Sequence, residues 1–128
     1  MKTIKRILLT FIILFSLTFL TITVFYPSYL SVYSACFPNS FNETYGKIYY
    51  TVGSLTVNES SGETNIYIAD YKDIKTIKHE HIHLIQYNQG RLFNCRNLFL
   101  KYFNEIEAYS FSMLPDKIYS LIYPNNFL

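Results

Sequence analysis

The chain has 128 residues, half of them hydrophobic, and a formal net charge of +2. This length is enough for one domain. Three basic residues, Lys2, Lys5 and Arg6, stand at the N-terminus, and the rest of the chain carries eight basic and nine acidic residues. Because that remainder holds no basic stripe, the sequence excludes nucleic-acid binding as an expected function.

The first predicted element is a membrane anchor. The 19 residues from Ile7 to Phe25 carry no charge. At about 1.5 Å per residue, a helix of this length nearly spans the ~30 Å of a bilayer's hydrocarbon core. A secretory signal has a shorter apolar stretch, about 7–15 residues, that ends in small residues. Bulky Tyr26-Pro27-Ser28-Tyr29 follows here instead, which favours an uncleaved transmembrane helix.

The chain is therefore expected to divide into two parts. Residues 1–30 would provide a cytoplasmic basic flank and the anchor, held in the membrane through residues 7–25. Residues 31–128 would form an extracytoplasmic domain, with secretion after signal cleavage as the alternative. This domain contains Cys36 and Cys95. A disulfide between them and two unpaired thiols are both open alternatives.

The segment after the anchor predicts a short antiparallel sheet. Lys47–Val52 and Leu55–Val57 are rich in β-forming residues, and Gly53-Ser54 between them is a turn signal. Asn65–Ala69 alternates in the manner of a further strand. Asn58–Glu63, which precedes it, predicts a polar loop.

Helices are predicted for the remainder of the chain. The first begins near Asp70 or Asp73, either of which can cap it, and stops at Gly90. A second runs from about Phe93 to Met113, and Pro115 opens a short third through Ile122. Strands followed by helices indicate an α+β fold.

All three histidines fall within His79-Glu80-His81-Ile82-His83. His79 and His83 are four residues apart, so on a helix their imidazoles project from one face and can bind one zinc ion. Glu80 lies beside that ion, where it can take a proton from a zinc-bound water whose pKa the metal lowers. His81 is about 200° round the helix from His79, which makes it a poor ligand. The alternative is a chance match on a solvated helix.

A catalytic zinc ion has a third protein ligand and an open position. The downstream candidates are Cys95, Glu105 and Glu107. Glu105 shares a helix face with Tyr102 and Tyr109, and we expect that face to be buried. A buried carboxylate needs a partner, and zinc would supply one. Glu107 is better placed for solvent.

The motif His79–His83 followed by Asn104-Glu105-Ile106-Glu107-Ala108 resembles the gluzincin metallopeptidases, and the compact size is similar to that of single-domain minigluzincins. The resemblance implies a membrane-tethered zinc metallopeptidase. Glu105 would be the third ligand beside His79 and His83, Glu80 would activate the zinc-bound water, and the substrate would be a peptide or protein.

The chain departs from the gluzincin pattern at two places. Tyr109 stands where these enzymes often have an Asp that holds the active-site histidine, and no histidine follows His83 to stabilise an oxyanion. A tyrosine hydroxyl from Tyr109, Tyr119 or Tyr123 is the expected substitute, since such a donor is worth roughly 10²–10³ in rate. A non-catalytic zinc-binding membrane-anchored domain is the alternative.

Overall fold

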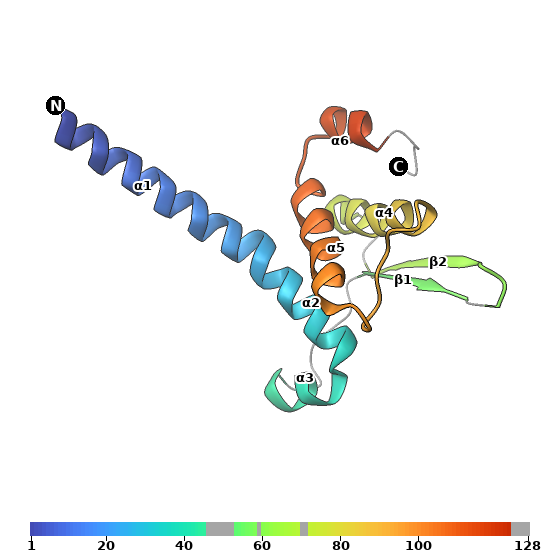
Figure 1. Ribbon diagram of the computed structural model, residues 1–128. Coiled ribbons are helices and arrows are strands. Elements are labelled where there is room, and N and C mark those ends of the chain that lie inside the picture. The colour runs from blue at the N-terminus through green and yellow to red at the C-terminus, as the bar shows by residue number, and fades with distance from the viewer. Residues whose placement is uncertain (46–52, 59, 70–71, 124–128) are drawn as a thin grey trace.

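The computed structural model describes residues 1–45, 53–58, 60–69 and 72–123. The described chain is mostly helical, with one two-stranded antiparallel sheet. A long N-terminal helix projects from a small body, and α5 (Leu98–Phe111) lies between that helix and α4 (Ile74–Asn88) (Figure 1). This arrangement is compatible with the expected α+β class, although helices provide most of it.

The N-terminal helix is continuous from Lys2 to Cys36 and is long and apolar enough to cross a membrane. It consists of α1 (Lys2–Leu20), a π-helical turn η1 (Thr21–Phe25) and α2 (Tyr26–Cys36). The helix therefore continues beyond residue 30, where the boundary between the anchor and the domain was expected. Pro27 lacks an N–H group, and the π-helical turn just before it changes the hydrogen-bonding pattern there without ending the helix.

The two halves of this helix differ in their surroundings. α1 buries none of its residues, whereas Val24, Ser28 and Val32 form a buried stripe that is spaced by four residues. That stripe belongs to the part of the helix that packs against α5. Only residues 2–20 are therefore detached from the body. The detached stretch ends at residue 20, whereas the sequence predicted that it would extend to residue 25.

Three side-chain links hold the second half of the helix to α5 and the loop before it. They are the hydrogen bond from Tyr102 Oη to the Phe25 carbonyl (3.2 Å), the Ser31 Oγ–Tyr109 Oη hydrogen bond (2.8 Å) and the Cys36–Cys95 disulfide. The disulfide joins positions 59 residues apart and resolves the alternatives that the sequence left open. After α2, the short helix α3 (Pro38–Tyr45) folds back beside it.

The sheet consists of β1 (Gly53–Val57) and β2 (Thr64–Ile68), with Gly53 opposite Ile68. The strand predicted near Asn65–Ala69 is confirmed, and the strand predicted at Lys47–Val52 lies outside the described residues. The turn predicted at Gly53-Ser54 is wrong, because both residues belong to β1. A Cβ on Gly53 would lie 2.6 Å from Thr76 Cγ2 of α4, so the glycine lets the strand approach the helix.

α4 has the predicted limits. The Asp73 side chain accepts a hydrogen bond from the Thr76 N–H at 3.1 Å, as an N-cap does, and Gly90 takes a φ of 70° just after the helix. α5 begins at Leu98, five residues later than predicted. The Asn104 side chain bonds the backbone of Arg91 and Phe93 at 3.0 and 2.7 Å, which holds that segment extended.

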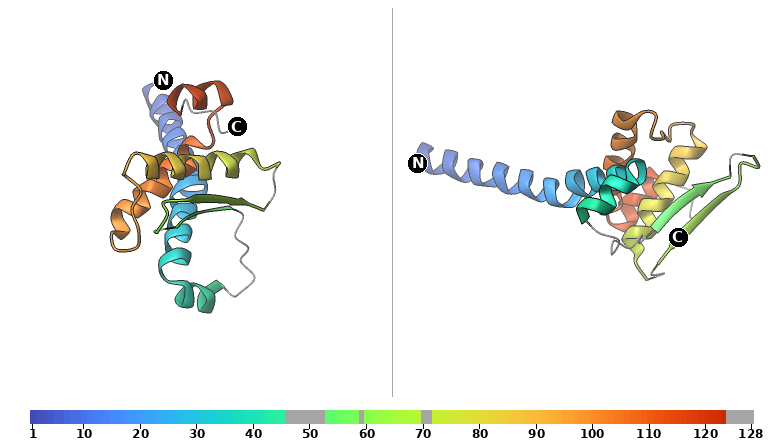
Figure 2. Two further views of the ribbon diagram at one scale, coloured as in Figure 1. Left: turned by 90° about the vertical axis from the view of Figure 1, so that its right-hand side faces the viewer. Right: turned by 90° about the horizontal axis from the view of Figure 1, so that it is seen from below.

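The C-terminal helix α6 (Asp116–Ile122) starts after Pro115 as predicted. A buried apolar core cluster joins the three C-terminal helices through one residue from α4, one from α5 and two tyrosines from α6 and its end: Ile82, Ala108, Tyr119 and Tyr123. Figure 2 shows α4 crossing beside α5, with the β1–β2 hairpin against α4. The core therefore fixes the spacing of the two helices that carry the predicted metal ligands.

Candidate metal centre

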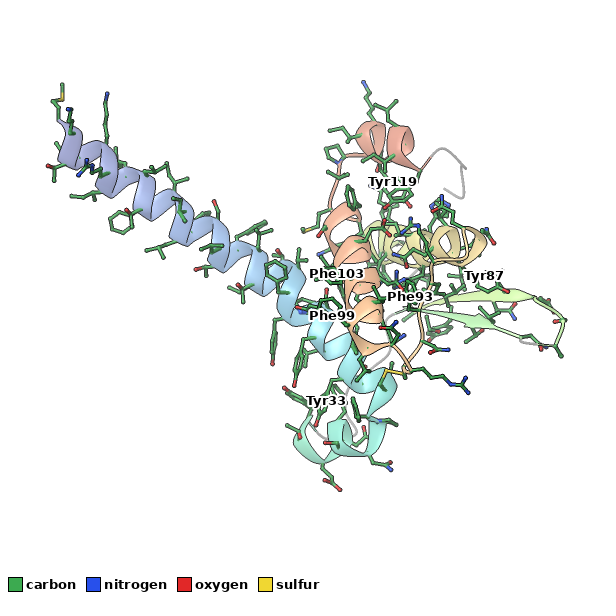
Figure 3. All side chains as sticks on the ribbon, viewed as in Figure 1. Tyr33, Tyr87, Phe93, Phe99, Phe103 and Tyr119 are labelled. Atoms are coloured by element: carbon green, nitrogen blue, oxygen red, sulfur yellow. A yellow bond between two sulfur atoms is a disulfide. The ribbon has the colours of Figure 1, made fainter. Side chains whose placement is uncertain are left out.

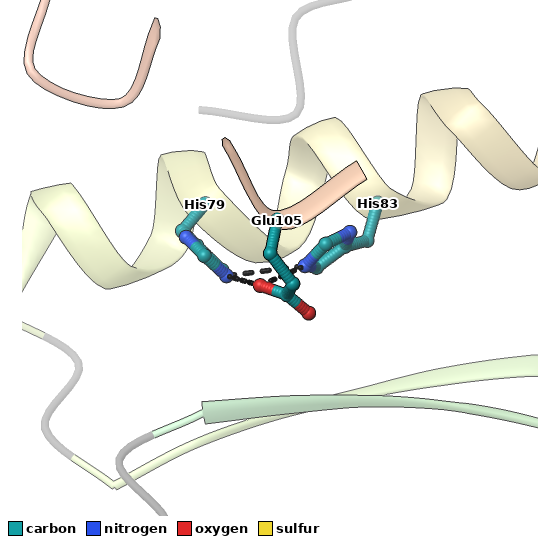
Figure 4. A group of neighbouring side chains, drawn as sticks. All are labelled: His79, His83 and Glu105. Atoms are coloured by element: carbon teal, nitrogen blue, oxygen red, sulfur yellow. Dashed lines mark hydrogen bonds and ion pairs between the residues drawn. The ribbon is translucent and has the colours of Figure 1, made fainter. Parts of the chain in front are cut away.

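Side chains from α4 and α5 converge where the two helices meet. His79 Nε2 lies 3.1 Å from Glu105 Oε2, and His83 Nε2 lies 3.3 Å from the same oxygen. The two Nε2 atoms are 3.1 Å apart (Figure 4). All three residues are buried, with exposed fractions of 7–9%. One donor atom from each residue therefore points at a common centre.

The donor set fits a zinc ion. Two imidazoles and a carboxylate, one atom each within 4.8 Å of the others, form a group that could hold a metal. The centre of the triangle with edges of 3.1, 3.1 and 3.3 Å lies roughly 1.8 Å from each atom, close to the ~2.0–2.1 Å of Zn–N and Zn–O bonds. Three protein donors also leave a coordination position open, as catalytic zinc sites do.

Glu105 and His83 shift each other's pKa values in the direction that favours their charged forms. Burial disfavours the Glu105 carboxylate, but hydrogen bonds from His79 and His83 outweigh burial and hold the pKa of Glu105 well below its ordinary value. Burial alone would lower the pKa of His83, but the hydrogen bond and charge of Glu105 outweigh it and raise that pKa. The cluster therefore keeps Glu105 ionised, and a divalent cation that bound here would displace the protons shared between this carboxylate and the imidazoles.

Glu80 follows His79 on α4 and lies between that helix and the start of β1. A Cβ on Gly53 would come within 3.2 Å of Glu80 Oε1, so the strand backbone passes directly over this carboxylate. Burial raises the pKa of Glu80, although the charges of His79 and His83 oppose that shift. A carboxyl group with a raised pKa is a stronger base once it is ionised, as general-base chemistry near neutral pH requires.

A hydrogen-bond chain orients His83. Its Nδ1 lies 2.8 Å from Gln86 Oε1, and the Gln86 amide nitrogen donates to the Asn104 carbonyl at 3.1 Å and to Glu107. Arg91 completes the chain with two bonds to Glu107 at 2.8 and 2.9 Å. Because the amide nitrogen is committed to acceptors, Gln86 Oε1 accepts from His83 Nδ1–H. When this ring is neutral, as metal binding requires, it would present the Nε2 lone pair to the cluster.

The chain through Gln86 was missed by sequence reasoning. The available signal was the spacing of three residues between His83 and Gln86, which places the two side chains on one helix face. From the sequence, Glu107 was a ligand candidate that was expected to face solvent. Its carboxylate instead binds Arg91 and Gln86, so the structure brings Glu105, and not Glu107, to the two histidines.

His79 is held differently. Its Nδ1 is buried and has no hydrogen-bond partner among the described residues. The Tyr109 ring packs against the imidazole, with centroids 4.2 Å apart. The Tyr109 hydroxyl, expected to face a reacting carbonyl, bonds Ser31 Oγ of α2 instead. Tyr109 thus occupies the position expected for an Asp but contacts His79 with its ring.

The other sequence candidates lie elsewhere. His81 points to the opposite side of α4, as its position about 200° round the helix predicts. Its Nδ1 lies 2.5 Å from the Tyr119 hydroxyl there. Cys95 is in the disulfide, which removes it as a thiolate ligand. Tyr123 packs on Phe111 and Tyr119 in the core. Neither Tyr119 nor Tyr123 is therefore placed beside the three converging donor atoms.

Comparison of the chain with protein-family models, with curated proteins and with solved structures found no significant match. The site is thus defined by its own residues and their geometry.

Proposed function

We propose that the chain is a membrane-anchored zinc-dependent peptidase with a gluzincin-like arrangement of residues. The observation that carries the proposal is the convergence of His79 Nε2, His83 Nε2 and Glu105 Oε2 in a buried cluster. Glu80 lies on the same helix and interacts electrostatically with all three groups. A ligand set with an adjacent carboxylate is what hydrolysis of a peptide bond requires.

Each residue has a defined task in this proposal. His79, His83 and Glu105 hold the metal, and Gln86 fixes the ring of His83. A bound zinc ion supplies Lewis acidity, which polarises a carbonyl and lowers the pKa of a coordinated water. Glu80 accepts the proton from the attacking water and returns it to the leaving amine. Because β1 passes close to Glu80 at Gly53, an extended peptide beside the hairpin would run close to this carboxylate.

The proposed location is the membrane, with the site outside the cytoplasm. The detached helix α1 is uninterrupted and apolar, and basic residues stand only at its N-terminal end, which favours a cytoplasmic N-terminus. The Cys36–Cys95 disulfide supports this orientation, because structural disulfides persist in oxidising compartments.

A non-catalytic zinc-binding domain is the second candidate. It is favoured by the Tyr109 hydroxyl, which is engaged with Ser31 and so is not directed at a reacting carbonyl. In that case the zinc ion would serve, with the disulfide, to stabilise a small body.

Replacing Glu80 by Gln separates the two functions. The variant keeps the side-chain shape but loses the proton acceptor, so zinc content stays near that of the parent while hydrolysis of a peptide library falls by about 10²–10⁴. Glu43→Gln, on the exposed helix α3, is the matched control and should match the parent in both measurements. Equal hydrolysis by parent and Glu80→Gln, with full zinc in both, contradicts the peptidase mechanism. No hydrolysis by either supports the non-catalytic domain.

A further inference from the structure

The first half of α5 exposes a cluster of large apolar side chains. Leu98, Phe99 and Phe103 are 40%, 69% and 49% exposed. The two phenylalanine rings contact each other edge to face, with centroids 4.9 Å apart. Side chains of this size are normally covered by a partner when they gather at one place. We call Leu98, Phe99 and Phe103 the α5 apolar cluster.

The position of this cluster relative to the N-terminal helix is fixed. Tyr102, which lies beside Phe103 on α5 and contacts its ring, donates a hydrogen bond to the Phe25 carbonyl at 3.2 Å. Phe25 is the last residue of the uncharged apolar run that begins at Ile7. The α5 apolar cluster therefore lies level with the end of the segment that is apolar enough to enter a bilayer. Figure 3 shows Phe99 and Phe103 on the part of α5 that adjoins this helix.

The side chains around the cluster have the composition of a membrane interface. Tyr26 and Tyr29 are exposed on α2, just beyond the apolar run. Aromatic residues concentrate at the headgroup level of membrane proteins. Arg96, which is exposed, and Lys101 flank the cluster in sequence and can contact lipid phosphates. Exposed apolar rings, tyrosines just beyond the apolar run and basic residues nearby in sequence are what a helix needs to rest on a bilayer.

We propose that Leu98, Phe99 and Phe103 insert into the interfacial layer of the bilayer that α1 crosses, so that α5 rests on the membrane surface. Lipid fits this cluster better than a protein partner does, because the cluster adjoins the N-terminal helix, whose own exposed apolar side chains need the same environment. Glu105 lies two residues after Phe103, so this contact also holds the His79–His83–Glu105 cluster at the membrane surface.

The chain contains no tryptophan, so a single introduced tryptophan reports on one position. The full-length protein would be reconstituted into vesicles of phosphatidylcholine and phosphatidylglycerol, with bromine on either a shallow or a deep acyl carbon. Phe103→Trp and Phe99→Trp test the cluster. Phe15→Trp in α1 reports on the anchor, and Tyr67→Trp, 56% exposed on β2, is the water-exposed control.

The proposal expects blue-shifted emission from Phe103→Trp and Phe99→Trp and quenching that is stronger with shallow bromine than with deep bromine. Phe15→Trp should show the reverse depth preference, and Tyr67→Trp should show neither effect. Emission from both cluster variants that matches Tyr67→Trp overturns the proposal. A blue shift without bromine quenching, strengthening with protein density in the vesicle, overturns it in favour of a second copy of the chain. Absence of quenching for Phe15→Trp overturns it together with the anchor.

Discussion

Replacement of Gln86 by leucine removes the side chain that orients His83 without touching any proposed zinc ligand. Gln86 is fully buried, and its oxygen lies 2.8 Å from His83 Nδ1. Its amide nitrogen donates to the Asn104 carbonyl and to Glu107. Leucine has nearly the same volume but no acceptor, so the His83 ring loses the bond that selects its tautomer and its rotation.

Gln86→Leu is expected to lower both the zinc affinity and the stability of the metal-free protein, and the two losses can be measured separately. Removing the outer partner of a metal-ligating histidine typically costs 10–100-fold in metal affinity, or about 1.4–2.7 kcal/mol. The metal-free protein should also lose about 1–3 kcal/mol, because the buried His83 Nδ1–H is left without a partner. Glu107 keeps its two bonds to Arg91, so its own contribution to that loss is small.

Both losses can be measured on the full-length protein in detergent. Zinc affinity would be determined by competition with a chromogenic chelator, and stability by denaturant unfolding of the metal-free form. Gln89→Leu is the matched control, because Gln89 is exposed at the end of the same helix and binds only Arg91 among the described contacts. Unchanged zinc affinity in Gln86→Leu would refute the orienting role, even if the variant were less stable.

Two other substitutions test separate parts of the structure. Glu105→Ala should abolish tight zinc binding in calorimetry, whereas Glu107→Ala should weaken it about tenfold or less, because Glu107 reaches His83 only through Gln86; equal losses would contradict the assignment of Glu105. Asp73→Ala should destabilise α4 by about 0.5–2 kcal/mol through loss of its N-cap. The hydrogen bond from Thr76 lowers the pKa of Asp73 below its ordinary value of 3.8 despite some burial. The cap therefore stabilises above that value and is lost in acid, so denaturant midpoints of parent and variant should converge as pH falls.

The sequence predicts the parts of this molecule that depend on local interactions. α4 is specified by Asp73 at one end, Gly90 at the other and helical spacing between them, and the common face of His79 and His83 follows from that helix alone. The preference for Glu105 over Glu107 rested on the expected burial of its helix face and on the gluzincin resemblance. Glu105 is buried, but Tyr102 and Tyr109, expected on the same face, bond the N-terminal helix instead.

The errors arise where distant segments decide the local conformation. Glycine at position 53 is typical of a turn, but here the lack of a side chain lets the strand lie close to Thr76. The neighbouring residues in the sequence give no sign of that contact. Phe93 continues a helical pattern, yet the Asn104 side chain captures its N–H at 2.7 Å and keeps it out of α5. Tertiary hydrogen bonds of this kind compete with local propensity, because they satisfy a backbone N–H that the first turn of a helix would leave unpaired.

α5 connects the N-terminal helix to the candidate metal centre because its faces carry different contacts. One side holds the N-terminal helix through Tyr102 and Tyr109, and Glu105 projects from the helix to the two histidines. Tyr109 does both, since its hydroxyl bonds Ser31 while its ring packs on His79. A helix held this way by the N-terminal helix and a disulfide cannot shift without moving a donor atom of the cluster. The second half of the N-terminal helix is therefore part of what positions the site, and residues 31–128 alone would lack Phe25, the partner of Tyr102.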